Sequence, residues 1–290
     1  MKEKTLIKER IMRGVFLGSA CICILCVALI CLFLFANGVP AMLKIGPLQF
    51  LTGTVWKPGS GVFGIAPMIL GSVYVTAGAV VCGVPGGVLT AVFMAKFCGK
   101  TLGKIIAPAV SLLAGVPSVI CGFFALVVLV PLNRAVFGGS GKSLLTASIL
   151  LGIMILPTII SVSEAALRSV PEAYYEGALA LGATHEQAVF FTVLPAAKPG
   201  ILAAVVLGIG RAVGETMAVV MVAGNQAVLP AAFPGSLARG LRTLTANIVL
   251  EMGYAADLHR EALIATAVVL FVFILCINLL LSIQKRRSRP

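Results

Sequence analysis

Two charged residues stand alone inside a long apolar run in the last third of the chain. Arg211 and Glu215 are the only charges between residues 199 and 224, and a spacing of four places them on one helix face, where they can pair. A buried charge in a membrane is costly unless it is paired, which makes such residues candidates for function. Two interpretations remain open. The pair either fixes the orientation of a helix, or Arg211 briefly holds an anion while Glu215 limits how tightly it is held.

Two more arginines follow in the segment 225–260. Arg239 and Arg242 are three residues apart, so they would share a face if this segment were helical. With Arg211 they could form a positive path for an anion, because guanidinium groups match the oxygens of groups such as phosphate. A solvated loop surface is the alternative.

No residue set typical of catalysis accompanies these charges in the sequence. His185 and His259 show no metal-ligand spacing, and no Ser/His/Asp or Cys/His set is apparent. Residues 138–143 end like a nucleotide-binding Walker A loop, but Val136 stands where its first glycine is required. We therefore expect the chain itself to be neither an enzyme nor a nucleotide-binding protein.

The composition shows what kind of element must position these residues. Hydrophobic residues make up 60% of the 290 residues and charged residues only 11%, where soluble domains carry about 25% charged residues. A mean hydropathy of +1.10 excludes a water-soluble fold. The sequence predicts an all-α integral membrane protein with six transmembrane helices, in the apolar runs 15–36, 67–95, 105–132, 143–165, 199–224 and 261–283.

The basic residues flank these runs and predict the topology. The net charge of +12 is concentrated before the first run and after the last, which argues against nucleic-acid binding. The segments on the side of the termini hold 14 Lys and Arg residues, and the segments on the other side hold 7. The excess places both termini in the cytosol of a cell that carries the chain in its inner membrane. We divide the chain into 1–66 (N-terminus, first helix and outer loop), 67–285 (a core of five helices) and 286–290 (a basic tail).

Several of the runs contain residues that interrupt helices. Pro85, Pro117 and Pro157 lie in the second, third and fourth runs, and the fifth run is rich in glycine. Small residues allow close helix packing in lipid. Broken helices also line transport pathways, so either or both interpretations apply.

The polar segment 166–198 is too long and too well capped for a simple linker. Ser169 and Glu172 form one predicted capping box, whose helix ends at Gly182, and Thr184 and Gln187 form a second. The second box opens a short helix that closes near Leu194 and Pro195. This pattern predicts a helix, a tight turn and a second helix, with Glu176, His185 and Glu186 facing a soluble partner. An amphipathic linker on the lipid surface is the alternative.

This segment resembles the EAA loop of ABC-importer permeases. The likeness rests on Glu176 to Ala178, on Gly182 after three intervening residues, and on Leu194-Pro195 at the far end. The sequence departs from the pattern at Gly177, where the family has alanine, and at Thr192, where it has isoleucine. The resemblance implies the type I ABC-importer permease (MetI-like) fold, with a cytosolic coupling helix that docks on a separate ATPase. The docking residues it implies are Glu176, Gly177, Ala178, Gly182, Ala183, Thr184, His185, Glu186, Leu194 and Pro195.

A second resemblance concerns the cargo. Residues 207–218 and 221–225 are similar to the signature of phosphate-specific (Pst) permeases, in particular the PstC-type subunit, and residues 115–124 and 244–248 agree. The resemblance covers about three-quarters of the chain. It implies an ATP-driven importer of inorganic phosphate. The substrate path would comprise Arg211, Glu215, Thr216, Arg239 and Arg242.

The same resemblance implies the partners. They are a homologous PstA-type permease, two copies of the ATPase, and an external phosphate-binding protein. The chain would bind no cofactor, because ATP and Mg²⁺ are used by the ATPase. Two alternatives remain: a permease of the same fold for sulfate or molybdate, and an ion-driven secondary transporter, which does not need an EAA-like loop.

Overall fold

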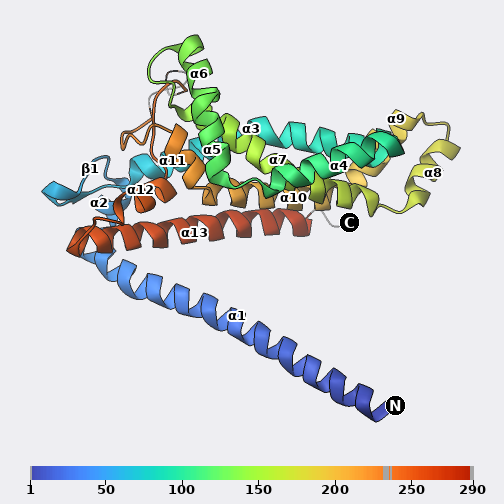
Figure 1. Ribbon diagram of the computed structural model, residues 1–290, viewed down its shortest axis with the longest axis horizontal. Coiled ribbons are helices and arrows are strands. Elements are labelled where there is room, and N and C mark those ends of the chain that lie inside the picture. Colours follow the sequence, from blue (N-terminus) through green and yellow to red (C-terminus); the bar gives the residue numbers. More distant parts are fainter. Residues whose placement is uncertain (1, 231–234, 236, 288–290) are drawn as a thin grey trace.

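The computed structural model describes residues 2–230, 235 and 237–287, and helices dominate it. Most of the long helices lie side by side along the longest axis (Figure 1). One end of this bundle carries α8 (Glu172–Ala180), with the N-terminal end of α1 and the C-terminal end of α13 on the same side. The other end carries α12 (Leu244–Glu251). We refer to these as the α8 end and the α12 end.

Within the described residues, six helical segments are long and apolar enough to cross a membrane, as the apolar runs predict. They are Glu9–Ile45, Ala66–Phe97, Ser118–Phe137, Leu144–Arg168, His185–Gly214 and Asp257–Leu279. They belong to α1 (Lys2–Ile45), α3 (Ala66–Val92), α5 (Ser118–Val127) with α6 (Leu129–Phe137), α7 (Leu144–Arg168), α9 (His185–Ala188) with α10 (Leu194–Gly214), and α13 (Asp257–Arg287). Two π-helical turns continue α3 and α9, namely η2 (Phe93–Phe97) and η3 (Val189–Val193).

The remaining elements are short. They are α2 (Pro47–Thr52), a hairpin of β1 (Trp56–Lys57) and β2 (Val62–Phe63) joined by the 3₁₀ turn η1 (Pro58–Ser60), α4 (Lys100–Gly115) and α11 (Met217–Val222). The hairpin is antiparallel, with Trp56 opposite Phe63. The predicted basic tail begins within α13, which runs to Arg287, and residues 288–290 lie outside the described residues.

Two of the predicted spans are interrupted, and both lie in runs in which the sequence places helix-interrupting residues. The run 105–132 divides between α4 and α5, where Val116 is extended at φ −67° and ψ 124°. Pro117 explains this break, because the residue before a proline is pushed out of the helical region. The run 199–224 divides between α10 and α11, where Glu215 is extended at φ −70° and ψ 127°.

The core is centred on α7, which packs closely against α3. A Cβ atom built on Gly83 would lie 2.7 Å from the main-chain oxygen of Gly152, and one on Gly87 would lie 2.7 Å from Cγ2 of Ile159. These distances leave no room for a side chain at either glycine position. The close packing predicted from small residues in lipid is therefore present between these two helices.

We expect Gly83→Ala to destabilise the protein and Gly86→Ala to be tolerated. The first methyl group would press on the rigid main chain of α7, and overpacking of this kind costs about 1–3 kcal/mol. The second would meet Cδ2 of Leu156 at 3.7 Å, which is ordinary contact. Thermal unfolding of the two purified variants checks this. Equal melting temperatures would contradict the close approach of α3 and α7.

α1 joins the bundle only near the α12 end (Figure 1). There Gly38 packs against α13, where an added Cβ would lie 2.6 Å from Cγ2 of Val268. Lys44 also forms an ion pair with Glu261 at 2.9 Å. None of the 18-residue apolar window of α1 is buried by the rest of the chain, so this helix offers its surface to lipid or to another protein.

Candidate functional site

The start of α8 differs from its predicted capping box. Ser169 continues the helical backbone of α7 at φ −79° and ψ −10°, and its Oγ donates to the main-chain oxygen of Ala166 at 2.8 Å. An N-cap residue needs a non-helical backbone, so Ser169 closes α7. α8 begins after Pro171, which makes no side-chain cap. The predicted Ser169–Glu172 box was therefore wrong.

The end of α8 agrees with its prediction. Gly182 has φ +88°. Its N–H donates to the oxygen of Leu179 at 2.9 Å, and the N–H of Ala183 donates to the oxygen of Ala178 at 3.1 Å. These two bonds define the Schellman motif, which needs a left-handed residue at the position of Gly182. The glycine therefore sets the tight turn that follows α8.

The second helix is capped as predicted but does not close where predicted. Thr184 Oγ1 accepts from the N–H of Gln187 at 3.3 Å, and the N–H of Thr184 donates to Gln187 Oε1 at 3.0 Å. From His185 the helix continues through η3 into α10 without a break. Pro195 lies in the first turn of α10, directly after the change of register in η3. A missing N–H costs little at such a position, so Leu194 and Pro195 do not end the helix.

The predicted docking residues are exposed to different degrees. Glu176, Gly177, Gly182, Thr184, Glu186 and Pro195 are exposed, while Ala178, Ala183, His185 and Leu194 are half-buried. The Nδ1 of His185 lies 2.8 Å from the hydroxyl of Tyr175 on α8, and its ring centroid is 4.7 Å from that of Phe97. His185 therefore holds the loop together and is less free to face a partner than its sequence position predicts.

Two large apolar side chains on this loop were missed by the sequence reasoning. Leu181 is 90% exposed and Phe191 is 79% exposed. Leu181 lies directly before the turn glycine, and that position is the one signal that could have identified it. Phe191 lies in η3, at the start of the next spanning segment, whereas an exposed side chain as large as Leu181 at a tight turn is typical of a protein-binding surface.

Arg211 does not pair with Glu215. α10 ends at Gly214, so the extended backbone of Glu215 removes the i, i+4 geometry on which that prediction depended. Instead, Nη1 of Arg211 donates to Oγ1 of Thr158 on α7 at 3.1 Å. No ion pair of Arg211 is found in the described part of the chain. Half-buried in a spanning segment, this guanidinium keeps donors for a ligand.

Glu215 and Thr216 form the link between α10 and α11. Glu215 Oε1 accepts from the N–H groups of Thr216 at 3.2 Å and Ala218 at 3.4 Å, so it caps the start of α11. Thr216 is half-buried and its Oγ1 donates to the oxygen of Gly214 at 3.2 Å. The main-chain oxygen of Glu215 accepts from Oγ1 of Thr245 at 3.3 Å. The link is thus held by local bonds and by α12.

Hydroxyl groups surround Glu215 in a small cavity. Ser72, Thr76, Thr243 and Thr245 line it together with Glu215, and all four hydroxyl residues are buried. They come from α3 and from the start of α12. The sequence reasoning missed these residues because scattered hydroxyl groups carry no spacing signal.

The break at Val116 and Pro117 lies near the break at Glu215. α5 packs against α11 so closely that a Cβ on Gly122 would lie 2.9 Å from Cα of Ala218 and from Sδ of Met221. Ala218 lies three residues after Glu215, whose carboxylate accepts from its N–H. α5 therefore brings the Val116–Pro117 break to the side of the link at Glu215.

The two arginines at the α12 end have different surroundings. The segment 239–242 is not helical, so they share no helix face. Arg242 is bound by a buried carboxylate: Nη1 donates to Glu251 Oε1 at 2.5 Å and to Asn247 Oδ1 at 2.9 Å. Arg239 is exposed and has no acidic partner among the described residues. Of these two arginines, Arg239 is therefore the one whose charge stays available to an anion.

Glu251 is the centre of this cluster, which was absent from the predicted site. Its Oε2 accepts from Trp56 Nε1 at 2.8 Å and lies 2.9 Å from Nε2 of His259. One buried carboxylate therefore links the hairpin, α12, α13 and Arg242. These contacts offset the charge of Arg242, so its guanidinium is less available to an anion than its sequence position predicts.

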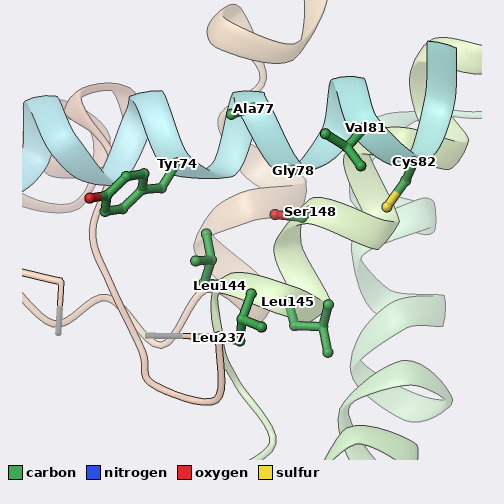
Figure 2. A pocket seen from close by; sticks show the side chains of 9 residues that line it. All are labelled: Tyr74, Ala77, Gly78, Val81, Cys82, Leu144, Leu145, Ser148 and Leu237. Carbon is green, nitrogen blue, oxygen red and sulfur yellow. The ribbon is translucent and has the colours of Figure 1, made fainter. Parts of the chain in front are cut away.

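An apolar pocket between α3 and α7 is separate from these charges. Figure 2 shows Tyr74, Val81 and Cys82 of α3 facing Leu145 and Ser148 of α7, with Leu237 closing one side. Its lining is apolar apart from the hydroxyl groups of Tyr74 and Ser148 and the thiol of Cys82. Such a lining does not suit a hydrated anion.

The fold, the loop and the charges define the membrane component of a transport system. Residues 83–290 match the family described as "Binding-protein-dependent transport system inner membrane component". The chain belongs to this family and is a multi-pass inner-membrane protein. The six helices and this family confirm the predicted importer-permease fold.

Named relatives and solved structures agree. The chain is 40% identical over 286 residues to the probable ABC transporter permease protein YqgH of Bacillus subtilis, with 94% of this chain and 91% of the relative covered. It is 35% identical to the phosphate transport system permease protein PstC of Mesorhizobium japonicum, with 82% and 78% covered. The fold is similar to a chain of the MetNI methionine ABC transporter, with a TM-score of 0.59, 23% identity, and coverage of 81% of this chain and 100% of that chain.

Proposed function

We propose that this chain is the PstC-type permease subunit of an ATP-driven importer of inorganic phosphate. The observation that carries the proposal is Arg211, a half-buried guanidinium in a spanning segment, with no acidic partner among the described residues. An unpaired cation inside a membrane costs free energy, and a bound anion would offset that cost. Relatives that carry the name of phosphate transport permeases support phosphate as the cargo.

The EAA-like segment 166–198, which contains α8, is the proposed contact with a separate ATPase. Its exposed Glu176, Leu181 and Phe191 offer a partner one charge and two apolar anchors. ATP and Mg²⁺ belong to that ATPase, and this chain holds no cofactor of its own. The complex further contains a second permease of the PstA type, two copies of the ATPase, and an external phosphate-binding protein.

The proposed orientation places the α8 end in the cytosol. Both described helix ends, the start of α1 and the end of α13, lie on that side (Figure 1), and the segments on that side carry 14 of the 22 Lys and Arg residues. The α12 end then faces outward, where Arg239 and the Glu251 cluster meet the binding protein. Basic residues that flank membrane spans set the topology of the chain. This role accounts for the net positive charge, and we expect no nucleic-acid partner.

Reconstitution tests the proposal. The chain is placed in liposomes with a PstA-type permease, the ATPase and the phosphate-binding protein, and the flux of labelled phosphate is measured with and without ATP. We expect ATP-dependent phosphate flux that sulfate and molybdate do not compete for. Competition by either would favour the other oxyanion, and flux driven by an ion gradient without ATP would favour a secondary transporter.

We expect Arg239→Gln to slow phosphate uptake at low ionic strength. Residues 225–250 contain no acidic residue, so the exposed Arg239 attracts anions over a distance that salt shortens. Uptake should become several-fold slower at low salt and approach the unaltered rate at high salt. Lys57→Gln, at an exposed position of the hairpin at the same end, is the matched control. An equal loss in both variants, or a loss that ignores salt, would rule out a specific role of Arg239.

A further inference from the structure

The end of α3 touches the docking loop at several points, although the two are far apart in sequence. Lys96 lies in the π turn η2, and its Nζ is 3.7 Å from Glu172 Oε2 at the start of α8. The same ammonium group lies over the ring of Tyr175, 5.3 Å from its centroid. The side chain of Lys96 is only 14% exposed. A half-buried cation that lies between the carboxylate of Glu172 and the ring of Tyr175 connects α8 to the end of α3.

Phe97 makes a second set of contacts from the same turn. Its ring packs edge-on to His185 at 4.7 Å and lies 6.3 Å from Phe190. His185 in turn meets the hydroxyl of Tyr175 at 2.8 Å. The turn η2 therefore contacts α8 through Lys96, and it contacts α9 and η3 through Phe97.

The end of α7 is fastened to the same turn. Nη2 of Arg168 donates to the main-chain oxygen of Met94 at 3.0 Å. Beneath these polar contacts, Ala91 and Val92 of α3 share one apolar cluster with Leu167, Val189 and Val193. The π turn is thus the point at which α3, α7, α8 and the α9–α10 helix meet.

We propose that α8 and the π turn η2 at the end of α3 move as one body. Lys96 and Phe97 in this turn then carry the displacement of the segment 166–198 directly into α3. They are positioning residues. The covalent chain connects α8 to α7 and α10 only, whereas these contacts add α3 as a third helix that the loop displaces. The inference rests on the proposed function, in which an ATPase moves α8.

A first experiment removes the charge of Lys96. Lys96→Gln should lower the phosphate moved per ATP hydrolysed by about threefold or more in the reconstituted complex, while the ATPase still co-purifies. Lys104→Gln is the matched control, because Lys104 is exposed on α4 and forms no ion pair within the described residues. The exchange Lys96→Glu with Glu172→Lys should restore part of the coupling. Unchanged coupling in Lys96→Gln would overturn the inference.

A second experiment replaces the contact by a covalent link. Lys96→Cys with Glu172→Cys, in a chain that also carries Cys98→Ser, is treated with a short bifunctional thiol reagent. Two positions that move together should cross-link, and the link should bring coupling back above that of the untreated variant. The single variant Lys96→Cys, treated alike, is the control. A cross-linked complex that no longer turns over, or a pair that does not cross-link, would show that α8 slides over α3.

The two proposals can fail separately. ATP hydrolysis by the assembled complex can be measured without following any ion, so it is recorded beside phosphate flux. An unaltered complex that hydrolyses ATP but moves no phosphate would remove phosphate as the cargo. The effect of the cross-link on ATP turnover would still decide whether α8 and α3 move together.

Discussion

Replacing Gly182 by alanine should uncouple the ATPase from transport. The glycine has φ +88°, a left-handed conformation that costs an alanine about 1–2 kcal/mol. A cost of this size reduces the population of correctly shaped loops by a factor of roughly 5–30. We expect co-purification of the ATPase and the phosphate moved per ATP hydrolysed to fall together, measured on the detergent-purified and reconstituted complexes.

Gly177→Ala is the matched control, because it adds the same methyl group within the same helix. An added Cβ at Gly177 meets nothing within 4 Å, and alanine is favoured over glycine in a helix by about 0.5–1 kcal/mol. The family pattern also has alanine at this position. We expect ATPase binding to be unchanged or improved. If Gly177→Ala and Gly182→Ala behaved alike, the turn would not be what the ATPase recognises.

Replacing Arg211 by alanine should abolish most phosphate transport while leaving the complex assembled. A hydrogen bond to a charged group contributes roughly 1.5–3 kcal/mol, which corresponds to a loss of about 10- to 100-fold in kcat/KM for phosphate. Assembly should survive because, within the described residues, the side chain of Arg211 makes one hydrogen bond, to Thr158. Labelled phosphate uptake into proteoliposomes, with subunit composition checked by gel filtration, measures both.

Two variants separate the charge of Arg211 from its hydrogen bond. Thr158→Val removes the partner hydroxyl but keeps the guanidinium, so we expect only a small loss of uptake. Arg211→Lys keeps the charge but loses the planar fork, so an intermediate loss is expected. Normal uptake in Arg211→Ala would remove this residue from the substrate path. A loss in Thr158→Val as large as in Arg211→Ala would make the role of Arg211 structural.

Local chemistry was sufficient to predict part of this structure from sequence. The six spans follow from runs of apolar residues, which need no knowledge of neighbours. The turn at Gly182 and the cap at Thr184 follow from bonds between residues a few positions apart. The family likeness then supplied the role of the loop, which physical reasoning alone left open between a docking element and a linker.

The errors occurred where residues distant in sequence determine the outcome. Glu251 lies only nine positions after Arg242, but no helical spacing indicated their pairing, and its bond to Trp56 spans 195 positions. The expected Arg211–Glu215 pair assumed a continuous helix, whereas α10 ends between the two residues. Ser169 closes α7 because that helix continues to Arg168, a length that the capping pattern alone cannot fix. His185 was predicted to be free because Tyr175 and Phe97 could not be placed beside it.

The interruption at Glu215 has a dielectric consequence for Arg211. Main chain that leaves a helix inside an apolar bundle is tolerated where protein or water satisfies its polar groups. The polar groups gathered at this link raise the local dielectric constant above that of the apolar bundle, and the attraction between a guanidinium and an anion weakens as that constant rises. In the proposed substrate path, the break that separates Arg211 from Glu215 would therefore also limit how strongly Arg211 holds phosphate. An ion held weakly in this way leaves quickly, which suits a path that must be emptied in every cycle.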